Sequence, residues 1–128
     1  MKILLLELSG SDSTSRTPGR YGGAGISLRR LAENIDNCYL AAEESCFEED
    51  LNKKCIPVEK QIVEYIRSGG DYGFTYYGMD KFDLYVYCNT SIVLNTKKPQ
   101  ICWSVGANEE IHPEIKHLLL HNAKWQKP

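Results

Sequence analysis

The residues best suited to bind a ligand lie in a glycine-rich segment near the start of the chain, Pro18–Gly25, whose sequence is PGRYGGAG. Adjacent glycines let the backbone come close to a ligand because they carry no Cβ atom. The amide groups at the start of a following helix favour a phosphate or a sugar hydroxyl. The dinucleotide fingerprint is excluded because Leu28 stands where its third glycine would be, and no Walker lysine follows. The segment predicts a ligand-binding loop of another kind, the alternative being a glycine-rich connection without a ligand.

Two of the three histidines have a spacing that could serve a metal ion. His117 and His121 are separated by three residues, so a helix would place both on one face, where a third ligand would complete a site. The acidic residue of the zincin arrangement is missing between them. We therefore expect these side chains to form a solvent-facing stripe on a surface helix, and we expect no metal site. A metal-dependent hydrolase would need the histidines, including His112, to converge with aspartates in the fold.

The elements around the glycine-rich segment determine where it lies. Lys2–Leu8 is a leucine-rich and isoleucine-rich run without alternation, which is typical of a strand buried on both faces of a parallel sheet. Helical periodicity begins at Ile26, with Leu28, Leu31, Ala32 and Ile35 on one face, Ser27 as cap and Asn37 as the end. The segment thus connects a strand to a helix. That position is the carboxyl edge of a parallel sheet, where such proteins bind ligands.

The rest of the chain repeats the alternation of strands and helices. We expect an acidic solvated loop over Glu43–Asp50 and a turn or short helix over Asn89–Lys98. The other expected elements are a strand over Cys38–Ala42, a helix that opens at Pro57 and ends at Gly69 and Gly70, a strand over Phe82–Cys88, a strand over Pro99–Val105, and a last helix that opens at Pro113 and buries Ile115, Leu118, Leu119 and Leu120. This order predicts an α/β fold, a three-layer Rossmann-like domain with a mostly parallel sheet of about four to five strands.

Composition excludes several classes of protein. A chain of 128 residues with 42% hydrophobic and 25% charged residues is typical of one globular domain, here residues 1–128. A net charge of −2 gives no basic surface for nucleic acid. The apolar run Ile3–Leu6 is too short for a membrane span. Five cysteines without a CxxC pair indicate reduced thiols and a cytoplasmic protein.

Five segments together resemble a known family. Met1–Leu6, Pro18–Gly23 and Leu28–Asn34 are similar to the opening of the family 4 glycosyltransferases, which reads as a hydrophobic strand, a proline-containing loop ending in Gly-Gly, and a leucine- and alanine-rich helix. Phe82–Tyr87 is similar to the family's Asp-led strand, and Lys98–Trp103 to its proline-led strand.

The resemblance implies a fold and an activity. The family has the GT-B fold, in which two Rossmann-like domains face a cleft, and this chain corresponds to the acceptor-side N-terminal domain. The implied reaction is hexosyl transfer from a nucleotide sugar, as co-substrate, to a glycan or lipid-linked acceptor, with no metal and no covalently bound cofactor. The family's paired-glutamate motif is absent, so we expect activity to need a nucleotide-sugar-binding C-terminal domain outside this sequence. A lipid-linked acceptor would bring the protein to the surface of a membrane.

The resemblance also indicates site residues. It puts Gly22 and Gly23 at the floor of the cleft, with Arg20 and Tyr21 lining it. Polar residues at later strand ends are candidates for acceptor contact: Asn89, Thr90, Ser104, Glu109 and Glu110. The family's histidine after the proline-led strand is absent from this sequence, so no catalytic base is assigned. The alternative function is a non-catalytic Rossmann-like or flavodoxin-like module that binds a ligand or regulates a partner.

Overall fold

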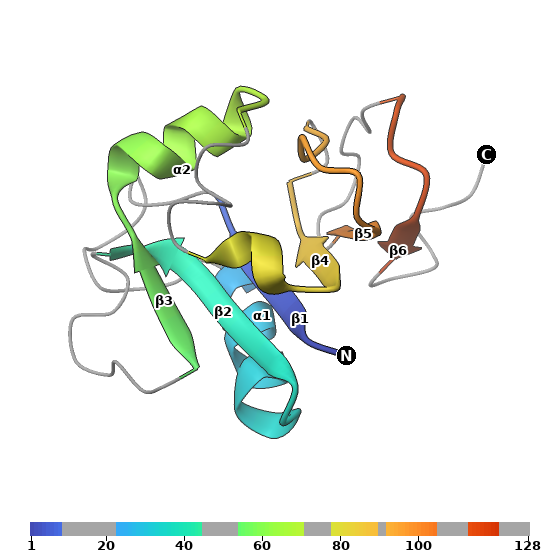
Figure 1. The fold of residues 1–128 in the computed structure, drawn as a ribbon. Helices are drawn as coiled ribbons and strands as arrows, with labels where there is room; N and C mark the ends of the chain where they lie inside the picture. Colours follow the sequence, from blue (N-terminus) through green and yellow to red (C-terminus); the bar gives the residue numbers. More distant parts are fainter. Residues whose placement is uncertain (9–22, 45–53, 71–77, 90–91, 105–112, 121–128) are drawn as a thin grey trace.

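Parallel pairing joins all the strands of the computed structural model, which describes residues 1–8, 23–44, 54–70, 78–89, 92–104 and 113–120. Within these residues one sheet of six strands has the order β3-β2-β1-β4-β5-β6 (Figure 1). The strands are β1 (Ile3–Glu7), β2 (Cys38–Glu43), β3 (Cys55–Val58), β4 (Leu84–Tyr87), β5 (Gln100–Ser104) and β6 (Leu118–Leu120). The helices are α1 (Gly23–Asn34), α2 (Lys60–Arg67) and the short 3-10 helix η3 (Met79–Lys81).

The apolar run at the start of the chain forms the central strand. β1 lies between β2 and β4, and the exposed fractions of Leu4, Leu5 and Leu6 are 0%, 1% and 1%. Leu4 and Leu6 pack in one core cluster and Leu5 in another, because successive side chains of a strand point to opposite faces. A strand covered on both faces needs apolar residues at every position, as predicted.

The two helices cover opposite faces of the sheet (Figure 1). Leu28 and Ala32 of α1 pack with Leu5 in one cluster, whereas Val63 and Ile66 of α2 belong to the other cluster. The result is three layers, helix, sheet and helix. The order 3-2-1-4-5 of the first five strands is Rossmann-like, which confirms the predicted fold class, and β6 extends it at one edge.

The helix predicted to open at Pro57 begins later. Pro57 lies exposed within β3, which pairs with β2, and α2 starts at Lys60. Proline is tolerated there because β3 is an edge strand among the described residues, so the missing N–H removes no bond to a second neighbour. The predicted end is confirmed, since the helix stops at Arg67 and Gly69 has a φ of 94°.

The predicted C-terminal helix is wrong. Pro113 lies in a turn, and Leu118–Leu120 form β6, with Cys102 opposite Leu118 in the parallel pairing with β5. A short apolar run can be a strand or a helix, and periodicity alone does not separate the two. The free edge of β5 supplies hydrogen-bonding partners that favour the strand.

α1 also differs from its predicted bounds. It begins at Gly23, so Ser27 lies inside the helix and does not cap it. It ends at Asn34, and Ile35 is 41% exposed just beyond it.

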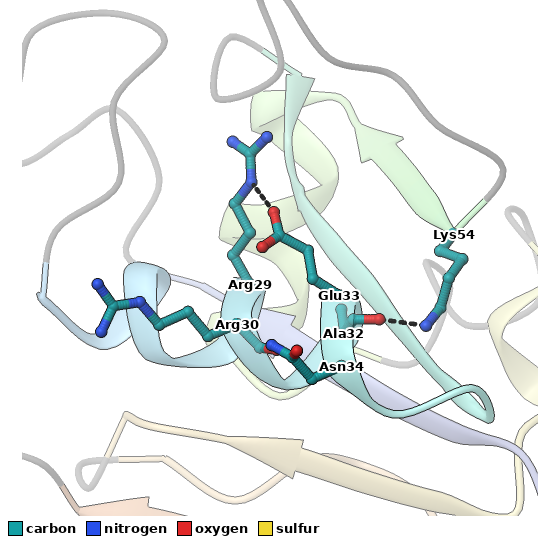
Figure 2. A network of polar contacts seen from close by, with 6 residues as sticks. All are labelled: Arg29, Arg30, Ala32, Glu33, Asn34 and Lys54. Atoms are coloured by element: carbon teal, nitrogen blue, oxygen red, sulfur yellow. Dashed lines mark hydrogen bonds and ion pairs between the residues drawn. The ribbon is translucent and has the colours of Figure 1, made fainter.

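Polar side-chain contacts stabilise the C-terminal end of α1 (Figure 2). The Lys54 ammonium, which comes from the residue before β3, donates to the carbonyl oxygens of Ala32 and Ile35, the latter over 2.8 Å. On the exposed side of the helix, Arg29 and Glu33 form an ion pair of 3.0 Å. A cation at this end satisfies carbonyls that have no partner within the helix and matches the helix dipole.

Candidate functional site

The strand order reverses at one point of the sheet. From β1 the chain proceeds outward through β2 to β3, and it then returns to β4 on the other side of β1 and proceeds outward to β5 and β6. β1 and β4 are therefore neighbours whose connections leave in opposite directions, and their carboxyl ends are at Glu7 and Tyr87. In open parallel α/β sheets this switch point is where a ligand-binding crevice forms.

The glycine-rich segment ends at this edge. It belongs to the connection between β1 and α1, and its last three residues, Gly23–Gly25, form the first turn of that helix. The first amide groups of α1 have no partner within the helix, and they lie at the carboxyl edge. Pro18–Gly22, with the predicted site residues Arg20, Tyr21 and Gly22, lies outside the described residues.

Two further predicted site residues reach the same edge. Asn89 follows β4 and is half-buried, and Ser104 is the last residue of β5, the neighbour of β4. Gly23, Asn89 and Ser104 thus follow three adjacent strands, β1, β4 and β5, at their carboxyl ends. Their roles in binding stay predictions. Thr90, Glu109 and Glu110 lie outside the described residues.

Two carboxylates at this edge are buried, which corrects the solvated loop expected from Glu43 onward, and Glu7 was not among the predicted site residues. Glu7 ends β1 and is 3% exposed, and Glu43 ends β2 and is 5% exposed. Successive side chains of a strand point to opposite faces of the sheet. Glu7 is therefore on the same face as Leu5, which α1 covers, and Glu43 is on the same face as Ala41, which α2 covers. Both side chains have interaction partners in the structure. An acidic residue inside an apolar run is a signal that could have indicated Glu7, which lies between Leu6 and Leu8, because acids are seldom fully buried unless paired.

Two tyrosines of β4 are held in the protonated form. Burial, with Asp80 and Asp83 nearby, raises the pKa of Tyr85 to about 12. Burial also raises the pKa of Tyr87 well above its usual range. The Tyr87 hydroxyl donates to the carbonyl oxygen of Ile92 over 3.2 Å and so ties the segment after β4 to the sheet. Neither hydroxyl group therefore acts as a base at neutral pH.

The histidines do not form the expected stripe. His117 is exposed and precedes β6, outside any helix, because the predicted helix is absent, while His112 and His121 lie outside the described residues. Among the residues that the structure describes, no three His, Cys, Asp or Glu side chains gather in a way that could hold a metal ion. Cys38, Cys55, Cys88 and Cys102 are free thiols. Burial raises the pKa of the Cys38 thiol, against a smaller opposing effect of Lys54.

Within the described part of the chain, no helix has the length and apolar character needed to cross a membrane.

Comparison with known proteins does not assign this chain to a family. No family model, no curated protein and no solved structure matches this chain. The likeness to the family 4 glycosyltransferases therefore rests on the motifs of the sequence, and the structure supports it at the level of a parallel Rossmann-like sheet.

Proposed function

We propose that this chain is the acceptor-side domain of a two-domain glycosyltransferase that transfers a hexosyl group from a nucleotide sugar to a glycan or lipid-linked acceptor. One observation carries the proposal: the glycine-rich segment enters α1 at Gly23, at the switch point between β1 and β4. The Gly-Gly loop of the resembled family occupies the equivalent place between first strand and first helix.

The residue types at this edge suit a sugar. Sugar hydroxyls both donate and accept hydrogen bonds, so their recognition needs amide donors together with oxygen acceptors. The first turn of α1 offers backbone amides, and Asn89 offers a side-chain amide with both a donor and an acceptor. The same helix terminus favours negative charge, which is useful beside the diphosphate that leaves the donor.

The proposed reaction exchanges one bond at the anomeric carbon. The acceptor hydroxyl oxygen forms a bond to that carbon, the bond from the carbon to the diphosphate oxygen breaks with its electron pair, and the hydroxyl proton passes to a base. The nucleotide-binding domain that holds the donor is outside this sequence, so the role of this chain is to bind and orient the acceptor.

Titration of the chain with simple glycans and with nucleotide sugars, followed by amide NMR, tests the proposal. We expect glycans to shift the amide signals of Gly23 to Ser27 and of Asn89, and we expect little or no transferase activity from this chain alone. Asn89→Ala should weaken glycan binding by about tenfold, the loss of one well-made polar contact to a ligand. The control Asn95→Ala, at an exposed residue before β5, should bind as the unmodified chain does.

The outcomes separate the two candidate functions. Robust turnover by the chain alone would refute the domain assignment. Binding of a nucleotide or another small molecule without glycan binding would favour the non-catalytic module, and equal affinities of the Asn89 and Asn95 variants would place the glycan elsewhere.

A further inference from the structure

A cavity of about 730 Å³ lies beside β4 and β5. Tyr87 and Leu94 line it, and both belong to the core cluster that contains Val63 and Ile66 of α2. The cavity is therefore on the α2 face of the sheet, whereas α1 packs on the opposite face. Its volume is within the range of small-molecule sites, roughly 300 to 1,000 Å³.

The cavity exists because irregular segments cover this part of the sheet. α2 packs over the side of the sheet that holds β1, β2 and β3, where Val58 and Leu4 meet its buried residues. Next to β5, the described segments 92–99 and 113–117 contain no helix. The cavity lies where these segments, and no described helix, cover the sheet.

Hydrogen bonds hold the walls of the cavity in place. The Gln100 side-chain amide accepts from the backbone N–H of Leu94 over 2.9 Å and donates to the Leu94 carbonyl over 3.0 Å. The Cys102 N–H donates to the His117 carbonyl over 2.9 Å, which fixes the second wall against β5. A cavity whose walls are bonded to the sheet is formed before a ligand arrives, which lowers the entropic cost of binding.

The charged residues that line the cavity are mostly basic. The chain as a whole carries a net charge of −2, yet the lining residues that the structure describes include Lys97, Lys98, Lys116 and His117 against one acid, Glu114. Lys98 is already engaged, since its ammonium donates to the carbonyl oxygens of Asp80 and Phe82. Lys97 and Lys116 are exposed and remain available to an anion.

The other lining residues are apolar. Leu94 is buried, and Ile115 is partly buried and packs against the same core cluster. Val93 is half-buried beside them. An apolar floor with a cationic rim fits a molecule that combines a hydrophobic ring with a negative group.

We propose that this cavity binds an organic anion, with an apolar ring against Leu94 and Ile115 and a phosphate, sulfonate or carboxylate near Lys97 and Lys116. None of the described lining residues is a candidate glycan contact, and the test of this site does not depend on transferase activity.

Two fluorescent probes of the same shape test the proposal. 8-Anilino-1-naphthalenesulfonate carries a sulfonate, and N-phenyl-1-naphthylamine is its neutral analogue. We expect the anionic probe to bind the unmodified chain and to shift amide NMR signals within 93–100 and 113–117. The double variant Lys97→Glu/Lys116→Glu should weaken the anionic probe by about tenfold or more and the neutral probe by less than about twofold.

A matched variant and a blocking variant complete the experiment. Lys81→Glu reverses the charge of an exposed lysine that does not line the cavity, so it should leave both affinities unchanged. Val93→Trp should fill the cavity and weaken both probes, with a near-UV circular dichroism spectrum and a thermal melt to establish that each variant is folded. Equal losses in Lys81→Glu and the double variant, or amide shifts confined to other parts of the chain, would overturn the proposal. If Val93→Trp does not fold, the two lysine variants and the amide shifts decide alone.

Discussion

Gly69 shows how one backbone angle determines a residue type. It follows α2 with a φ of 94°, a value that side-chain-bearing residues rarely adopt, and an added Cβ would meet nothing within 4 Å. Any cost of substitution there is therefore conformational and not steric.

Gly69→Ala should destabilise the protein by about 1 to 2 kcal/mol, because the new Cβ makes the left-handed conformation unfavourable. The free energy of unfolding in urea measures the effect. Gly69→Asn is the matched variant and should cost less, since asparagine tolerates this region better. Equal stability of Gly69→Ala and the unmodified chain would show that the turn relaxes to another conformation.

At the scale of single elements, a prediction was correct where the local sequence pattern fits one type of element only. β1, β2, β4 and β5 lie where the apolar runs predicted strands, and α1 follows the periodicity of Leu28 and Ala32. Pro57 and Val58 of β3, and the whole of β6, were predicted as parts of helices. Their assignments depended on a proline and on three leucines, residues that a sheet edge accepts as readily as a helix start or a helix face.

The candidate site was likewise predicted in part. Its position after the first strand followed from the order of elements, and Gly23, Asn89 and Ser104 do follow adjacent strands. The burial of Glu43 could not be predicted, because it depends on which strands and helices enclose the end of β2.

The end of α1 depends on a residue from another element, and this gives a second test of stability. Lys54→Met keeps the apolar stem but removes the donor to the carbonyls of Ala32 and Ile35. We expect a loss of about 1 to 2 kcal/mol in the free energy of unfolding, since a charged hydrogen-bond donor and a favourable dipole interaction disappear together.

Lys81→Met provides the control for that change, because this lysine is exposed. It should alter the free energy of unfolding by less than about 0.5 kcal/mol. A Lys54→Met variant as stable as this control would mean that water replaces the ammonium at no cost.

At the scale of the whole molecule, the burial of Tyr85 in β4 makes the stability of the protein depend on pH in the alkaline range. Tyr85 is 1% exposed, and its pKa is raised to about 12 in the folded protein, against an ordinary value of 10.0. The unfolded chain therefore loses this proton first as the pH rises. The contribution of Tyr85 to stability is complete below about pH 10 and is lost between about pH 10 and pH 12.

Thermal melts between pH 8 and pH 12 check this expectation. The unmodified chain should lose stability more steeply above pH 10 than Tyr85→Phe, which cannot ionise at this position. The lost hydroxyl can lower the stability of Tyr85→Phe at every pH, so the slope and not the absolute value is compared. Identical slopes would show that Tyr85 does not control the alkaline transition.

The sequence by itself determined the class of the fold, the central strand and the order in which a glycine-rich loop leads into a helix. These properties follow from local composition and periodicity, which depend on residues close together in the chain. Only the tertiary structure decided that β3 and β6 are strands, that Glu7 and Glu43 are buried, and that a cavity with a cationic rim lies beside β5. The physical reason is that strand pairing, burial and cavities arise from contacts between residues far apart in the sequence, and these contacts exist only once the sheet has formed.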